Sequence, residues 1–168
     1  GGSPIENPGE IGSCTAQAAV GGLEYMERRA HGRHIDASRL FLYKVTRNLL
    51  GWRGDTGANL RTTIQALAQY GAPPESLWPY RVNQLDVEPP PSVYEEAEKW
   101  QALEYFRLDP PSVDGVTLLQ AVKEVIATGL PVMFGFRVYE SIRSRQDGVI
   151  PWPRDNEAEI GGHALVAI

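Results

Sequence analysis

The chain has 168 residues, of which 42% are hydrophobic, and its 16 Lys and Arg against 21 Asp and Glu give a formal net charge of -5. This length and hydrophobic content fit one globular domain, or two small lobes that share an interface, and they argue against disorder. The acidic balance argues against a nucleic-acid partner, and no apolar run approaches the roughly 18 residues that span a bilayer.

Helices are expected to dominate the first hundred residues. Ser13 is a good N-cap for a helix over about 14–29, whose apolar residues recur at helical spacing and whose Gly21 and Gly22 indicate a close contact of this helix. Asp36 is expected to cap a second helix over 38–50. A third helix is expected over 60–70, and a short one over 93–103.

Strands are expected in the last sixty residues. The segment 103–108 alternates like a strand, and Asp114 is expected to cap a helix that runs to Gly129. Further strand candidates are the apolar or small-residue segments 130–139, 148–153 and 161–168. Helices followed by strands predict an α+β protein, or a helical lobe that faces a sheet lobe.

Cys14, which stands directly before the first helical pattern, is the only cysteine. The chain therefore has no internal disulfide, which is compatible with the cytoplasm, as is the absence of a visible signal peptide. A buried cysteine without chemistry is one interpretation of Cys14. A reactive thiol is the other, because the unpaired N–H groups of a helix N-terminus favour a thiolate.

Three histidines are candidates for chemistry. His31 and His34 lie in the polar turn "HGRH", where solvent exposure is the ordinary state and no set of metal ligands can be identified, so no metal site is expected. His163 follows two glycines and begins a strand of small residues, from which an imidazole can project into a cleft; an inert core histidine is the alternative. Together, Cys14 and His163 suggest a nucleophile and its base.

Three motifs, taken as a set, resemble the papain-like cysteine protease family: "GSCTAQAA" at a helix start, "AQYGAPPESLWPY" in the middle and "GGHALVAI" on a late strand. The likeness covers nearly the whole chain and is closest to the disulfide-free prokaryotic branch. It implies a two-lobe papain-like fold with the active-site cleft between the lobes. A helical left lobe would cover about 10–102, and a β-barrel-type right lobe would cover about 103–168 plus the N-terminal segment.

The resemblance implies an endopeptidase that forms an acyl-enzyme, with Cys14 as the thiolate nucleophile and His163 as its imidazolium partner. The backbone N–H of Cys14 would donate to the oxyanion. The positions that match the family's substrate-binding sites are Thr56, Gly57 and Ala58, which would bind an extended peptide, and Gly135, Gly162 and Ala164, which would shape the pocket for the second residue before the cut. Small residues there favour an apolar or aromatic side chain of the substrate.

Pro8 departs from the family pattern, which has a glutamine at this position whose amide donates to the oxyanion. Proline offers no donor, and the loss of one such donor costs about 3 kcal/mol, or about two powers of ten in rate. Asn7 and Gln17 are the nearest candidates for a substitute donor.

The family's asparagine that orients the histidine should follow more than a dozen residues after His163, so the right lobe is expected to be incomplete at the C-terminus. These departures keep two alternatives open: a catalytically impaired pseudoenzyme that binds peptides, and a cysteine acyltransferase or peptide ligase. The expected partners are a peptide or protein substrate and a pro-segment or inhibitor, with no cofactor, and the protein is expected to be a monomer.

Overall fold

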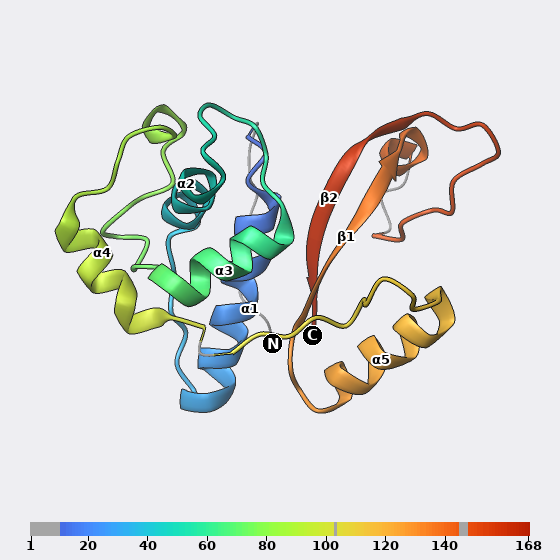
Figure 1. Cartoon of the computed structure of the whole chain (residues 1–168), viewed down its shortest axis with the longest axis horizontal. Helices are drawn as coiled ribbons and strands as arrows, with labels where there is room; N and C mark the ends of the chain where they lie inside the picture. Colours follow the sequence, from blue (N-terminus) through green and yellow to red (C-terminus); the bar gives the residue numbers. More distant parts are fainter. Residues whose placement is uncertain (1–10, 103, 145–147) are drawn as a thin grey trace.

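The computed structural model describes residues 11–102, 104–144 and 148–168. Figure 1 shows α1 to α4 packed together on one side of the molecule, and α5 with the two strands on the other. The helices are α1 (Cys14–His31), α2 (Arg39–Leu50), α3 (Leu60–Tyr70), α4 (Pro91–Ala97) and α5 (Gly115–Ala127), and the strands are β1 (Val132–Tyr139) and β2 (Glu159–Ala167). Short 3₁₀ helices cover Val82–Gln84, Glu98–Trp100 and Glu140–Ser144.

The helix caps agree with the sequence at some positions and correct it at others. Asp114 caps α5 as predicted, since its carboxylate accepts from the amides of Val116 and Thr117. The prediction that Asp36 caps the second helix is wrong: the cap is Ser38, whose hydroxyl accepts from the amide of Phe41. Ser38 has the extended backbone that an N-cap needs, and it stands directly before Arg39, the first residue of the helix.

The hydrophobic core lies among α1 to α4. α2 runs through its centre, and four consecutive residues of this helix are fully buried: Leu40, Phe41, Leu42 and Tyr43. Because four consecutive residues point to all sides of a helix, this part of α2 is enclosed on every side. Because α1 and α3 both pack on α2, the core fixes the N-terminal ends of these helices relative to each other.

β1 and β2 form an antiparallel pair in which Gly135 lies opposite Ala164 and Phe136 opposite His163. This confirms the strands expected at 130–139 and 161–168. The strands expected at 103–108 and 148–153 are wrong, because 104–108 and 148–153 form no strand and residue 103 lies outside the described residues. The expected β-barrel-type right lobe is not seen either: the described parts of the chain contain one two-stranded sheet, so only the α+β class is confirmed.

α1 and β2 are neighbours and run in the same direction (Figure 1). Val166 of β2 lies against Gly21 and Gly22 of α1, at 3.6 and 3.8 Å from the place where a Cβ atom would stand on each glycine. The contact that the two glycines indicated is therefore a contact with a strand. Within the described ranges, no helix has both the length and the apolar character needed to cross a membrane.

Candidate active site

Cys14 is the first residue of α1, and its free thiol is half-buried. Ser13 occupies the N-cap position but does not cap the helix with its side chain. Its hydroxyl instead lies 2.6 Å from the hydroxyl of Tyr80, and its own amide donates to the carbonyl of Ile11 at 2.8 Å. Ser13 is fully buried, so these contacts hold the chain in place directly before the thiol.

The residues after Cys14 fasten the same helix end to its surroundings. The hydroxyl of Thr15 accepts from that of Thr63 on α3 at 3.0 Å. The side-chain amide of Gln17 points back to the Ser13 hydroxyl at 3.5 Å, so this candidate oxyanion donor is already directed at another acceptor. Pro8 and Asn7, which the sequence analysis also connected with the oxyanion, lie outside the described residues.

His163 lies on β2 and is half-buried. Its ring contacts the ring of Phe136, its cross-strand neighbour, edge to face with the centroids 5.9 Å apart. In the described structure no hydrogen bond joins His163 to Cys14. Catalytic hydrogen bonds are often long before a substrate binds and shorten only in the complex.

Cys14 and His163 lie at the same level along the contact between α1 and β2. Cys14 precedes Gly21 by a helical stretch that is about 10 Å long at 1.5 Å per residue. His163 precedes Val166 by a strand stretch that is about 10 Å long at 3.3 Å per residue. Because Gly21 and Val166 are in contact and α1 and β2 run in the same direction (Figure 1), these equal lengths bring Cys14 and His163 to a similar level along the interface.

The loop that contains Thr56, Gly57 and Ala58 lies beside the segment that precedes Cys14. A Cβ atom on Gly12 would stand 3.2 Å from the Cα of Gly57, so the two backbones are in close contact. Gly57 adopts a φ of 71°, which favours glycine, and its amide donates to the hydroxyl of Tyr43 at 2.9 Å. Thr56 is exposed and Ala58 is half-buried.

The three predicted pocket residues share one face of the sheet. Gly135 and Ala164 are opposite each other, and Gly162 is two residues from Ala164, so alternation places all three on the same side. A Cβ atom on Gly135 would lie 3.3 Å from Leu60, the first residue of α3, which follows the 56–58 loop. This face therefore approaches the helices near that loop, whereas His163 is on the alternate set of positions with Phe136.

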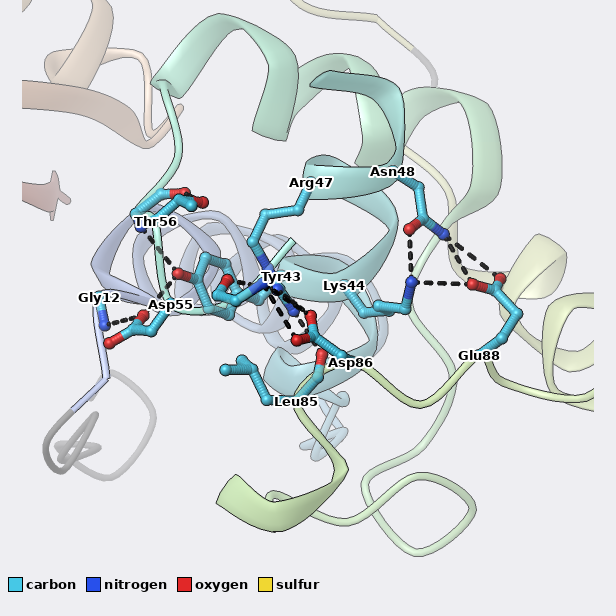
Figure 2. Close-up of polar contacts among 12 residues, drawn as sticks. Gly12, Tyr43, Lys44, Arg47, Asn48, Asp55, Thr56, Leu85, Asp86 and Glu88 are labelled. Atoms are coloured by element: carbon cyan, nitrogen blue, oxygen red, sulfur yellow. Dashed lines mark hydrogen bonds and ion pairs between the residues drawn. The ribbon is translucent and has the colours of Figure 1, made fainter. Parts of the chain in front are cut away.

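The 54–57 turn is held by a polar network that the sequence analysis missed (Figure 2). Arg47 of α2 donates to the carbonyl of Gly54 at 2.6 Å and to Asp86 at 2.7 Å, and it also bonds the carbonyl of Leu85. Asp86 accepts from the amide of Gly54, so both polar groups of that glycine are bound. The hydrogen bond from Arg47, together with that from Gly54, lowers the pKa of Asp86.

Tyr43 belongs to the same network. Its hydroxyl donates to Asp55 at 2.7 Å, and Asp55 also accepts from the amide of Gly12 at 2.8 Å. Burial raises the pKa of Tyr43, and the hydrogen bond to Asp55 adds to this shift, so the phenol is neutral. Tyr43 and Arg47 are one helical turn apart on α2, which is the only signal in the sequence that relates them.

The other two histidines lie at or just beyond the C-terminal end of α1, at the opposite end of the helix from Cys14. His31 ends α1 and lies 3.9 Å from Glu27, and His34 is exposed in the turn that follows. Among the residues that the structure describes, no group of three or more His, Cys, Asp or Glu side chains could hold a metal ion.

The sequence is 35% identical over 168 residues to an uncharacterised peptidase C1-like protein of Acanthamoeba polyphaga mimivirus, in a match that covers 95% of this chain and 53% of the viral protein. The structure matches that of xylellain, a cysteine protease from Xylella fastidiosa, with 30% identity and a TM-score of 0.80, over 98% of this chain and 66% of xylellain. The chain belongs to the papain-like cysteine protease family.

The papain-like fold is also shared with more distant plant enzymes. A cysteine protease of Carica candamarcensis in complex with E-64 is 19% identical with a TM-score of 0.66, and the match covers 98% of this chain and 70% of that one. Bromelain from Ananas comosus, in complex with the same inhibitor, is 15% identical with a TM-score of 0.71, and the match covers 99% and 69%. No protein-family model matches the sequence. This papain-like chain spans about half the length of its curated viral relative.

Proposed function

We propose that this protein is a cysteine endopeptidase in which Cys14 is the nucleophile and His163 its acid–base partner. The observation that supports the proposal is their level along the interface: Cys14 begins α1, His163 lies on β2 beside that helix, and each precedes the contact between the two elements by about 10 Å. A helix N-terminus and a nearby imidazolium are the two features that make a thiol reactive at neutral pH.

In the first step the Cys14 thiolate attacks the carbonyl carbon of the scissile bond, and the backbone N–H of Cys14 donates to the oxyanion. The first N–H groups of a helix have no partner within the helix, so this donor is available to the oxyanion. His163 then gives its proton to the leaving amine, and the C–N bond breaks to leave an acyl-enzyme. In the second step His163 removes a proton from water, which attacks the acyl carbon and releases Cys14.

The substrate is a peptide or protein that binds in extended form along Thr56, Gly57 and Ala58, with one side chain directed at the sheet face of Gly135, Gly162 and Ala164. An exposed loop close to the nucleophile supports the first assignment, and a face of small residues near Leu60 supports the second. A roomy pocket of this kind takes an apolar or aromatic side chain. The helical lobe would cover about 10–102 and the second lobe 103–168 with the N-terminal segment, in a monomer controlled by a pro-segment or inhibitor.

A peptide-binding pseudoenzyme is the second candidate, and Pro8 is the observation that favours it, because proline supplies no side-chain donor to the oxyanion. The two candidates differ in the reactivity of the thiol, since a binding module has no need for an activated cysteine.

The test is the alkylation of Cys14 by iodoacetamide between pH 5 and pH 9, together with hydrolysis of a fluorogenic peptide. We expect rapid alkylation of Cys14 near pH 6, where a free thiol with a pKa of about 8.5 hardly reacts. Cys14→Ala should abolish hydrolysis and leave the circular dichroism spectrum unchanged. His163→Ala should shift the alkylation profile to that of a free thiol, while His34→Ala, the control, should leave it unaltered.

The same alkylation experiment can contradict the peptidase assignment. If Cys14 in the wild-type protein reacts only above about pH 8.5, like a cysteine without a partner, the peptidase assignment is wrong and the peptide-binding module takes its place.

A further inference from the structure

Asp55 connects three parts of the candidate site through one carboxylate oxygen. Its Oδ1 accepts from the backbone amide of Gly12 at 2.8 Å and from the hydroxyl of Tyr43 at 2.7 Å. The same Tyr43 hydroxyl accepts from the amide of Gly57 at 2.9 Å. The segment before Cys14, the central helix α2 and the 56–58 loop are therefore joined by three hydrogen bonds (Figure 2).

The support for these bonds is rigid. Tyr43 is fully buried on α2, and the guanidinium of Arg47 lies 4.4 Å from the centre of its ring. Arg47 and Asp86 bind the carbonyl and the amide of Gly54, so the residue before Asp55 is fixed as well. Asp55 itself is exposed and Gly12 is half-buried, but Tyr43 is part of the core.

The hydrogen bonds through Asp55 and Tyr43 connect Gly12 and Gly57, which belong to different parts of the chain. Gly12 leads to Cys14 two residues later, and Gly57 lies in the middle of the proposed substrate loop. Their backbones are in close contact, with no side chain between them. Nothing in the local sequence of either segment determines their spacing, whereas the chain of hydrogen bonds from Gly12 through Asp55 and Tyr43 to Gly57 does.

We propose that Asp55 is a positioning residue, which sets the distance between the Cys14 thiol and the loop that holds the substrate; this inference rests on the proposed peptidase function. One extended peptide must contact the loop and present its scissile carbonyl to the thiol at the same time. Since a misplacement of about 1 Å can cost about 10²-fold in rate, a bond that fixes this spacing affects catalysis without touching the substrate.

The experiment compares Asp55→Ala, Asp55→Asn and Tyr43→Phe with the wild-type protein. Alanine removes the acceptor, so we expect kcat/KM for a peptide to fall about tenfold, mainly through a lower kcat. Asparagine retains an oxygen that accepts from both donors, so we expect it to restore kcat/KM to within about twofold. Tyr43→Phe should resemble Asp55→Ala. The pH profile of Cys14 alkylation by iodoacetamide should stay unchanged in all three, because this reagent does not use the loop.

Two matched variants serve as controls. Asp109→Ala removes another exposed carboxylate, which pairs with Arg107. Tyr94→Phe removes another phenol that donates to a carboxylate, that of Glu88, which lies outside the network around Asp55. Neither change should alter kcat or KM, so a loss of activity that is common to all five variants would contradict the proposal.

Amide hydrogen exchange provides a readout that does not depend on activity. In Asp55→Ala the amides of Gly12 and Gly57 should exchange faster than in the wild type, while the amides of α2 keep their protection. Unchanged exchange at both glycines, or faster exchange with an unchanged kcat, overturns the role of Asp55. If the wild-type protein hydrolyses no peptide, the proposed function fails, and the exchange of Gly12 and Gly57 still decides whether Asp55 sets their spacing.

Discussion

Arg47 shows how a single residue can order a loop from inside the core. Its side chain is fully buried, which is unfavourable for a cation unless it is paired; both terminal nitrogens are bound, whereas Nε has no hydrogen-bond partner among the described residues. Its partners are the carbonyls of Gly54 and Leu85 and the carboxylate of Asp86, all of which lie in loops. The buried guanidinium therefore anchors the loops at Gly54 and at 85–86 to the core. The proposed substrate loop, 56–58, follows directly after the first of them.

Asp86 gives this arrangement a pH dependence. The hydrogen bond from Arg47 holds the pKa of Asp86 below its ordinary value of 3.8 in the folded protein. The carboxylate therefore stabilises the fold above that pH, and its contribution is lost as the pH falls through the lowered pKa. Asp86→Asn should lower the urea midpoint at pH 7, and the difference from wild type should be smaller at pH 3, below the ordinary pKa of the carboxyl. An equal difference at both pH values would contradict this reasoning; Asp109→Asn is the surface control.

At the scale of elements, two glycine positions predict opposite effects of the same substitution. Gly21 lies inside α1, and a Cβ atom there would meet Val166 at 3.6 Å, an ordinary contact. Gly21→Ala should therefore raise the free energy of unfolding by about 1 kcal/mol, the usual gain in a helix interior. Gly71 ends α3 with a φ of 76°, and a Cβ atom there would overlap the carbonyl of Ala97. Gly71→Ala should therefore lower the melting temperature. A loss of stability from Gly21→Ala would show that α1 and β2 pack too tightly to accept a methyl group at Gly21.

Local signals predicted the helices, although one cap lies at Ser38 and not at Asp36, and the other failures occurred where structure depends on a partner. Asp114 was recognised as a cap because a cap is made within a few residues of its own position. The segments 104–108 and 148–153 have strand-like composition but no strand beside them, and a strand exists only as a pair. Cys14 and His163 were proposed from residue type and resemblance. The role of Asp55 could not be predicted, because its hydrogen bond with Gly12 joins residues 43 positions apart in the sequence, and no local pattern relates residues at that separation.

Across the whole molecule, buried side chains are unevenly distributed. The core cluster belongs to α1 to α4 and the segments between them. α5 has no buried residue: Val116 is 80% exposed and Leu119 53%. On the sheet, Phe134 is 38% exposed although it stands on a strand. The side that carries His163 therefore has much less apolar burial to stabilise it than the side that carries Cys14.

This imbalance predicts that the molecule opens in two stages. Because local stability follows buried apolar contacts, the amides of α5 should exchange with solvent at least about tenfold faster than those of α2. Exchange followed by mass spectrometry at pH 6 and pH 7 would measure both helices in one sample, and a rate that rises with pH shows that the opening equilibrium is being observed. Equal protection of α5 and α2 would mean that the two sides unfold as one unit. Faster opening of α5 would mean that the side with α5, β1 and β2, which carries His163, opens while the helices around Cys14 stay folded. Because the proposed substrate contacts both sides, its binding should then slow the exchange of β2 more than that of α2.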